Sequence, residues 1–188
     1  FGLISGNAGD VTLLSAPDGV PVHASVASRI PQGFGWSVWL YAVDAARGVA
    51  LVLETDFNVP VNGALPHPPV LTRLSMRTGA LIDQRVLPTS AVVSEIELNA
   101  AGDRLAMATM GVYGSTAGVH VLDIETLQVL ASNTSVSPGS VAPGPPALAW
   151  TDDGSRLLVV TFTVTQQTAL RSVLVLDGGS LAVVGALG

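Results

Sequence analysis

Apolar residues run along the whole chain in short blocks of four to eight, separated by Gly, Pro, Asp and Asn. The longest blocks include 157–164 and 172–176. β-Branched and aliphatic blocks of this length favour strands. A helical spacing of i, i+3, i+4 is missing, and Gly or Pro interrupts almost every window long enough for a helix. The pattern predicts an all-β protein whose sheets are buried on both faces.

The chain also repeats itself. One unit is a strand, a polar turn ending on Gly, and a second strand, at 96–109 and again at 147–161. Its turn glycines, Gly102 and Gly154, are 52 positions apart, and a weaker copy occupies 39–53. This unit predicts a hairpin, because glycine permits the positive φ that a tight turn requires.

A second hairpin follows each copy of the first. Residues 119–130 match 173–184 at an offset of 54. Earlier copies are 70–87, with its turn at 77–79, and 11–26, with its turn at 17–19. Two hairpins per period of about fifty residues predict small sheets of four antiparallel strands.

The repeated residues resemble a known family. Each copy has a turn, then Arg-Leu at 104–105 or 156–157, then a β-run, then Val-x-Val-Leu-Asp at 119–123 or 173–177. This order of motifs is similar to that of the YVTN or YncE-like and WD40-like seven-bladed β-propellers. The resemblance covers 91–188 well and 1–90 loosely. The usual Ser-Pro-Asp-Gly turn is replaced in both copies, and the Gly-His and Trp-Asp dipeptides of WD40 blades are missing, which argues against a eukaryotic WD40 protein.

We therefore expect a single propeller-type domain or fragment of three and a half to four blades. The predicted divisions are a partial blade at 1–35, in which 1–6 forms a strand and 10–30 a hairpin of the second kind, and blades at 36–90, 91–140 and 141–188. An open arc of blades would expose apolar sides. Three explanations remain open: a longer propeller, a four-bladed ring completed by a strand from elsewhere, or capping by neighbouring subunits.

Composition narrows the classes of function. The 188 residues are 48% apolar and 12% charged, with a net charge of −6, eight scattered arginines, no lysine and no cysteine. A scattered set of basic residues argues against nucleic acid as a partner. No apolar block approaches the roughly 20 residues of a transmembrane helix. Disulfides and thiolate metal sites are excluded.

Candidate metal ligands have structural alternatives that we favour. His23, His67 and His120 share no spacing, and no Gly-x-Ser-x-Gly motif supports a catalytic serine. Acidic turn residues could bind Ca²⁺, but Asp in a tight turn is explained by hydrogen bonds to its own backbone. These turn residues are Asp18, Asp103, Asp152 and Asp153. Asp123 and Asp177 occupy equivalent positions and predict a repeated structural hydrogen bond.

Aromatic residues give the candidate binding surface. Phe34, Trp36, Trp39 and Tyr41 form the one aromatic cluster of the chain. Trp39 and Tyr41 alternate along a predicted strand, where they would line a sugar- or peptide-binding surface or pack between blades, and packing is the favoured interpretation. Asn133 begins an Asn-Thr-Ser sequon and is a candidate glycosylation site.

The leading functional hypothesis is a non-enzymatic binding or structural scaffold, extracellular, periplasmic or at the cell surface. Its partner is a protein or another copy, bound through open blade edges, and no cofactor, catalytic residue or metal site is expected. Repeated head-to-tail association would build a filament. The alternative is a propeller enzyme subunit, because the resemblance extends to quinoprotein dehydrogenases and lactonase-type hydrolases.

Overall fold

In the computed structural model, the described residues form fifteen strands and include no helix. Their backbone forms four antiparallel sheets, three of them with four strands. The predicted fold class is confirmed. The structure describes residues 3–5, 10–14, 21–26, 37–56, 67–89, 91–110, 117–136, 148–164 and 169–187.

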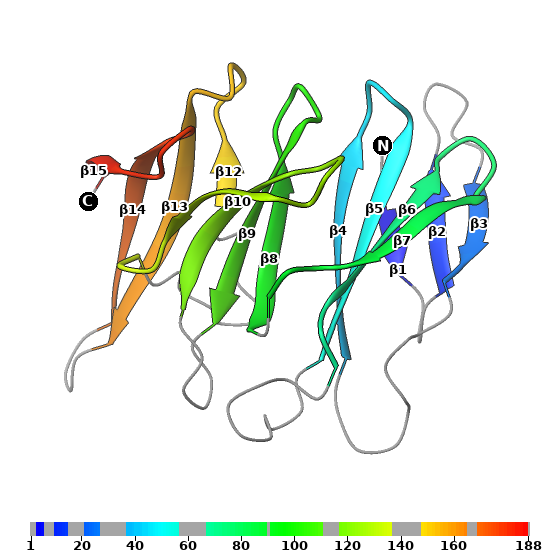
Figure 1. Ribbon diagram of the computed structural model, residues 1–188, viewed down its shortest axis with the longest axis horizontal. Helices are drawn as coiled ribbons and strands as arrows, with labels where there is room; N and C mark the ends of the chain where they lie inside the picture. The colour runs from blue at the N-terminus through cyan, green and yellow to red at the C-terminus, as the bar shows by residue number, and fades with distance from the viewer. Residues whose placement is uncertain are drawn as a thin grey trace. The chain divides into compact units, whose positions relative to one another are not determined.

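The chain divides into two compact units. Unit 1 comprises Phe1–Val61 and Leu65–Thr89, and unit 2 comprises Asn62–Ala64 and Ser90–Gly188. Each unit contains two sheets, labelled in Figure 1. The two units are described separately below.

Unit 1 holds a sheet of three strands and a sheet of four, each paired in chain order. The first sheet consists of β1 (Leu3–Ser5), β2 (Asp10–Leu14) and β3 (Pro21–Ser25). The second consists of β4 (Ser37–Asp44), β5 (Val49–Asp56), β6 (Val70–Ser75) and β7 (Leu81–Val86). The predicted first strand and the hairpin after it are present as β1 and β2–β3.

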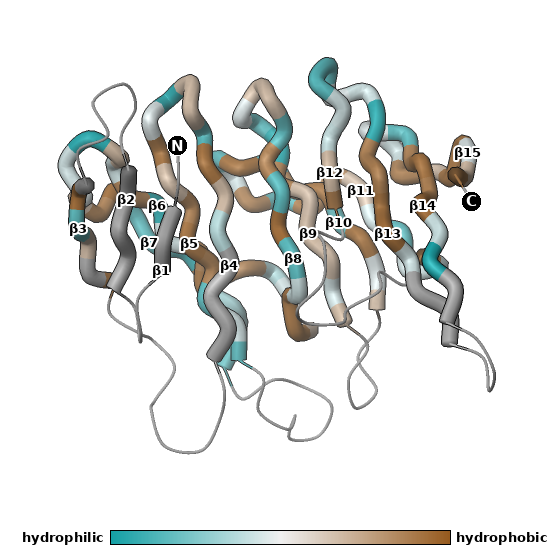
Figure 2. Tube along the Cα trace, turned by 180° about the vertical axis from the view of Figure 1, so that it is seen from behind, coloured by the Kyte–Doolittle hydropathy of each residue, from teal (hydrophilic) through white to brown (hydrophobic). Residues whose placement is uncertain are grey.

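Unit 2 holds two sheets of four strands, and every neighbouring pair is antiparallel. The first sheet consists of β8 (Val92–Leu98), β9 (Arg104–Met110), β10 (Gly118–Asp123) and β11 (Val129–Asn133). The second consists of β12 (Leu148–Trp150), β13 (Arg156–Val164), β14 (Ala169–Asp177) and β15 (Val183–Leu187). Figure 2 shows β13 coloured as hydrophobic along much of its described length.

The two turns at one end of each four-stranded sheet are joined by a backbone hydrogen bond that recurs three times. In each case the residue after the third strand donates its N–H to a carbonyl of the turn between the first two strands. The bonds run from Met76 to Gly48 (2.8 Å), from Ile124 to Asp103 (3.0 Å) and from Gly178 to Ser155 (2.9 Å). The bond confirms that the two hairpins form one repeating unit.

The turn before each outer strand places one residue in the left-handed region. Gly79, Leu127 and Leu181 have φ of 70°, 56° and 58°, and each donates its N–H to a carbonyl four residues earlier at 2.8 Å. A Cβ on Gly79 would lie 2.9 Å from the carbonyl oxygen of His23, so this position of unit 1 excludes a side chain. The leucines are buried, and their side chains offset the cost of a conformation that L-residues avoid.

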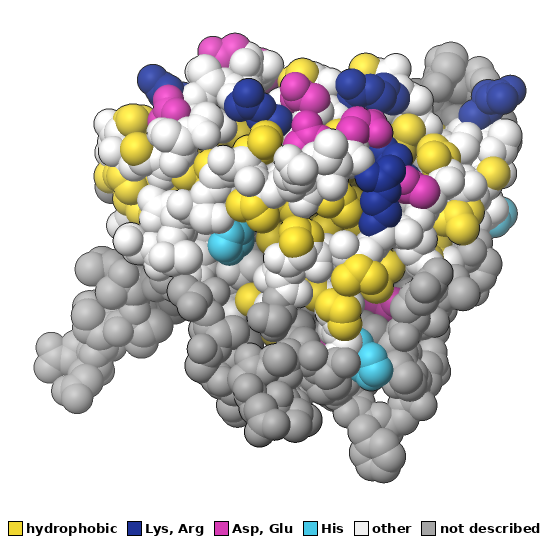
Figure 3. Space-filling view, viewed as in Figure 1, with side chains coloured by type: hydrophobic (Ala, Val, Ile, Leu, Met, Phe, Trp, Pro, Cys, Tyr) yellow, Lys and Arg dark blue, Asp and Glu magenta, His cyan; other side chains and the backbone are white. Residues whose placement is uncertain are grey.

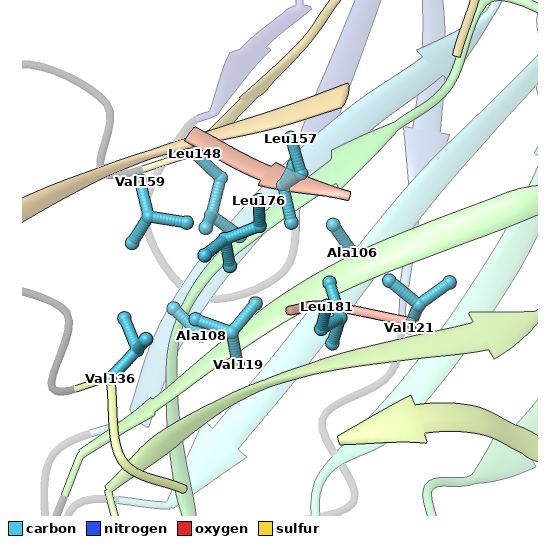
Figure 4. Packing of buried hydrophobic residues seen from close by; sticks show 10 residues of the cluster. All are labelled: Ala106, Ala108, Val119, Val121, Val136, Leu148, Leu157, Val159, Leu176 and Leu181. Carbon is cyan, nitrogen blue, oxygen red and sulfur yellow. The ribbon is translucent and has the colours of Figure 1, made fainter. Parts of the chain in front are cut away.

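The core of unit 2 lies between its two sheets. Small residues of β9 and β10 face larger residues of the next sheet, and Figure 4 shows these side chains gathered in the space between the sheets. The cluster comprises Ala106, Ala108, Val119, Val121, Val136, Leu148, Leu157, Val159, Leu176 and Leu181. Unit 1 has a comparable core, formed by Ala24, Val26, Ala50, Val52, Leu74 and Met76. Apolar burial of this kind supplies the main driving force for packing one sheet on another.

Candidate functional site

The candidate site is the face of the β12–β15 sheet that points away from the core of unit 2. Leu157 and Val159 of β13 point into that core, so the alternating Leu158 and Val160 lie on the opposite face. Their strand partners on β14 are Val175 and Val173. Adding the half-buried Ala149 of β12, which pairs with Leu158, completes what we call the open face. These five residues are aliphatic, and by the same alternation the ion pair of Arg156 and Asp177 lies on the same face, at its turn end.

The β8–β11 sheet shows what normally covers such a face. Val119 pairs with Ala108 and Val121 pairs with Ala106, as Val173 pairs with Val160 and Val175 with Leu158 in the next sheet. We call these four residues of β9 and β10 the covered face, because Leu148, Leu157, Val159, Leu176 and Leu181 pack on it. The covered residues are at most 1% exposed, whereas those of the open face are half-buried. The open face therefore repeats, by strand register, a surface that binds a sheet.

Sequence reasoning missed these open-face residues, although the signal was present. The offsets of 52 and 54 already aligned Leu158 with Ala106 and Val175 with Val121. Alternation along β13 and β14 then separates the two faces. The aligned residues of β9 and β10 are covered, so the face of β13 and β14 that corresponds to them is the open one.

The three histidines lie on or beside three different strands, namely β3, β6 and β10. Both ring nitrogens of His120 are hydrogen-bonded, Nε2 to Thr109 Oγ1 at 3.2 Å and Nδ1 to Ser132 Oγ at 2.9 Å. Burial lowers the pKa of His120 and favours its neutral form. His23 lies exposed on β3, and His67 precedes β6. Within the described ranges, no three His, Asp or Glu side chains form a group that could hold a metal ion.

The acidic residues of the turns serve the turns themselves. Asp123 Oδ1 accepts from the Thr126 N–H at 2.7 Å, and Asp177 Oδ1 accepts from the Ser180 N–H at 3.0 Å. This is the predicted repeated hydrogen bond. Asp153 accepts from the hydroxyl of Thr151 and from the N–H and hydroxyl of Ser155, and these hydrogen bonds lower its pKa to about 2. Asp103 accepts a hydrogen bond from Asn99 at 2.7 Å, and Asp152 lies exposed in the same turn as Asp153. Asp18 lies outside the described residues.

The aromatic cluster is described only in part. Phe34 and Trp36 lie outside the described residues, and Trp39 lies in β4 opposite Glu54. Tyr41 is half-buried and packs against the core cluster of unit 1. Tyr41 therefore packs between the sheets of unit 1. A ligand-binding role for the four aromatic residues stays a prediction.

Asn133 contributes to the packing of the two sheets of unit 2. Its Nδ2 donates to the carbonyl oxygen of Leu181 at 2.8 Å, and its Oδ1 accepts from the Ser135 N–H at 2.9 Å. A glycan would attach to the same Nδ2 atom. Glycosylation of Asn133 stays a prediction, and this contact is one that a glycan would have to accommodate.

A second feature that the sequence reasoning missed is a pair of half-buried carboxylates on β8. Burial raises the pKa of Glu95, with a smaller contribution from the nearby charge of Glu97, and burial also raises the pKa of Glu97. Trp150 of β12 donates its indole N–H to the carbonyl oxygen of Glu97 at 3.1 Å. The Glu-Ile-Glu alternation in a first strand was the available signal.

Comparison with known proteins yields the fold alone. No family profile matches the chain, and no curated protein matches its sequence. Hydrazine synthase from Kuenenia stuttgartiensis is similar in structure, with a TM-score of 0.58, 17% identity, and coverage of 94% of this chain and 42% of the other. BamB from Moraxella catarrhalis is also similar, with a TM-score of 0.56 and 14% identity. The alignment covers 98% of this chain and 45% of the BamB chain.

The β-propeller domain of the trilobed protease from Pyrococcus furiosus gives a TM-score of 0.51 with 13% identity, and the alignment covers 82% of this chain and 43% of that one. This chain therefore spans less than half the length of each of these three solved chains. No described helix is long and apolar enough to cross a membrane. The four-stranded antiparallel sheets and these neighbours together identify the fold as that of β-propeller blades.

Proposed function

We propose that this chain is part of a non-enzymatic, YVTN or YncE-like β-propeller scaffold that binds protein, and that another propeller sheet covers its open face. The observation that carries the proposal is the equivalence of the open face and the covered face in strand register. The covering sheet comes either from further chain or from a neighbouring subunit. An extracellular, periplasmic or cell-surface location belongs to the same proposal.

Two further observations support a binding role rather than catalysis. Asp123, Asp153 and Asp177 are engaged in turn hydrogen bonds, as is expected of structural acids. An aliphatic surface like the open face is typical of a contact between proteins or blades. Of the structural neighbours, hydrazine synthase is named for an enzymatic activity, so the fold itself does not separate the two classes.

The chain in solution tests the proposal. We expect it to self-associate or to bind a hydrophobic dye such as anilinonaphthalene sulfonate, measured by light scattering and by fluorescence. Val160→Asp places a charge on the open face and is expected to lower both signals. Gln128→Asp adds the same charge at an exposed turn and is the matched control, with no expected effect. A monodisperse monomer that binds no dye would overturn the proposal.

A further inference from the structure

Three side chains form a hydrogen-bonded row across the β8–β11 sheet. Ser132 of β11 pairs with His120 of β10, and Thr109 of β9 pairs with Gly118, two positions before the histidine, so all three side chains lie on one face. Nδ1 of His120 is 2.9 Å from Oγ of Ser132, and Nε2 is 3.2 Å from Oγ1 of Thr109. Ser132 is exposed, His120 half-buried and Thr109 fully buried. Figure 3 shows histidine side chains, in cyan, at the surface.

The buried end of this row fixes the position of the proton on His120. Thr109 donates its one hydroxyl proton to the carbonyl oxygen of Gly118 at 3.3 Å, so its oxygen accepts from the imidazole. The ring therefore carries its proton on Nε2, and Nδ1 presents a lone pair to the hydroxyl of Ser132. Burial lowers the pKa of His120, so this lone pair is available at neutral pH. A serine hydroxyl that donates to a neutral imidazole is the arrangement that makes a serine nucleophilic.

The other two four-stranded sheets show that strand pairing does not require these residues. The equivalent cross-strand pair in the β4–β7 sheet is Thr72 and Gln84, joined by a hydrogen bond of 3.0 Å. In the β12–β15 sheet it is Leu174 and Ala186. A polar pair and an aliphatic pair both occupy the position, so the repeat alone does not select histidine and serine. Among the described sheets, β8–β11 alone combines a base with a hydroxyl there.

We propose that Ser132 is a modification site, which takes up an acyl group from an activated ester or thioester with His120 as its general base. Oγ of Ser132 attacks the acyl carbon while its proton passes to Nδ1 of His120. The bond from the acyl carbon to the leaving oxygen or sulfur breaks, and the leaving group receives the proton from Nδ1. The products are an ester on Ser132 and a free alcohol or thiol. This inference goes beyond the proposed function, because a single transfer adds a group to the scaffold without a catalytic cycle.

The composition of the chain makes the reaction simple to measure. The chain contains neither lysine nor cysteine, which are common competing nucleophiles. The probe is p-nitrophenyl acetate: absorbance follows the release of p-nitrophenolate, and mass spectrometry of peptides cut at arginine locates the acetyl group. We expect one acetyl group per chain, on Ser132. Ser135, an exposed serine of the same segment, is the internal control and is expected to react at least about a hundredfold more slowly.

Two pairs of measurements assign the roles of the serine and the histidine. Ser132→Ala is expected to abolish rapid labelling, whereas the matched variant Ser135→Ala leaves it unchanged. His120→Leu places the side chain of the equivalent Leu174 in β10 and is expected to lower the Ser132 rate to that of Ser135. Circular dichroism of each variant checks that it is folded.

The pH profile of the wild-type protein is a further readout that needs no variant. The Ser132 rate is expected to fall at low pH as His120 takes up a proton, with a midpoint below the ordinary histidine value of 6.5, because burial lowers this pKa. Equal rates at Ser132 and Ser135 would overturn the inference, as would a Ser132 rate that is unchanged in His120→Leu or an acetyl group on a histidine in place of Ser132. Val160→Asp, which tests the open face, is expected to leave the Ser132 rate unaltered, so this inference and the proposed function fail separately.

Discussion

The two sheets of unit 2 have the same strand register and different surroundings. The covered face of the β8–β11 sheet carries Ala106 and Ala108 on β9, where the open face of the β12–β15 sheet carries Leu158 and Val160. Five larger side chains of the next sheet fill the space above the alanines. Side-chain size at a fixed strand position therefore reflects what packs on it, because a protein interior is close-packed.

The sheets differ again on their other faces. His120 of β10 bonds to Thr109 and Ser132, whereas the equivalent residue of β14 is Leu174, which packs against the core of unit 2. Thr161 of β13 keeps a hydroxyl bond to the carbonyl of Ser172 at 3.2 Å, as Thr109 does to Gly118 at 3.3 Å. The hydrogen bond from the threonine hydroxyl is therefore common to both sheets, whereas the hydrogen bonds of His120 occur in the β8–β11 sheet alone.

The largest expected effect comes from placing the same charge on the covered face and on the open face. Val121→Asp on the covered face is expected to cost about 4 kcal/mol or more, since it buries a carboxylate without a partner. Val175→Asp is its equivalent on the open face and is expected to cost less than about 1 kcal/mol in the monomer, where no further sheet covers that face, as substitutions near solvent usually do. Urea denaturation followed by circular dichroism measures both. Equal costs would show that the open face is covered in solution.

The next largest effect concerns Leu181, one of the residues that cover the β8–β11 sheet. Leu181→Ala removes a fully buried side chain and is expected to cost about 3 kcal/mol. Leu181→Gly removes the same side chain but relieves the left-handed backbone, so it is expected to be about 1 kcal/mol more stable than Leu181→Ala. Thermal unfolding of the two variants checks the order. The reverse order would contradict the account of backbone strain at this turn.

The smallest effect is the pH dependence contributed by His120. Because burial lowers the pKa of the folded imidazole, the unfolded chain binds a proton more readily, and stability falls as pH drops below about 6.5. His120→Leu, which copies Leu174, is expected to remove this loss. Glu95 and Glu97 act in the opposite direction because their pKa values are raised. The measurement is therefore the difference in unfolding midpoint between variant and wild type at pH 5 and pH 7.5.

If that difference is the same at both pH values, His120 does not titrate in the folded protein in the way its burial indicates. Urea midpoints are preferred to thermal midpoints here, because they compare the stability of the variant and of wild type at one temperature. Ser132→Ala is a useful companion, since it removes the bond to Nδ1 while keeping the ring.

Much of the fold could be predicted from the sequence because the repeat is local. The turn around Gly102 and its copy at Gly154 fix two hairpins, and the matching Asp123 and Asp177 fix two more. The open face and the β8 carboxylates were harder, because burial depends on packing between segments far apart in the chain. The residues next to Val121 and Val175 are alike, so only the alignment of the two copies of the repeat relates the covered residue to the open one.

The paired turns of each four-stranded sheet have a consequence for how such a protein can diversify. Backbone bonds tie both turns at one end of the sheet, from Met76 to Gly48 and at the two equivalent places. The connections at the other end differ in length, with residues 57–69 after β5 but only 165–168 after β13. New loops, grafted epitopes or reporter peptides therefore belong at that second end, where a change of length leaves the strand register intact.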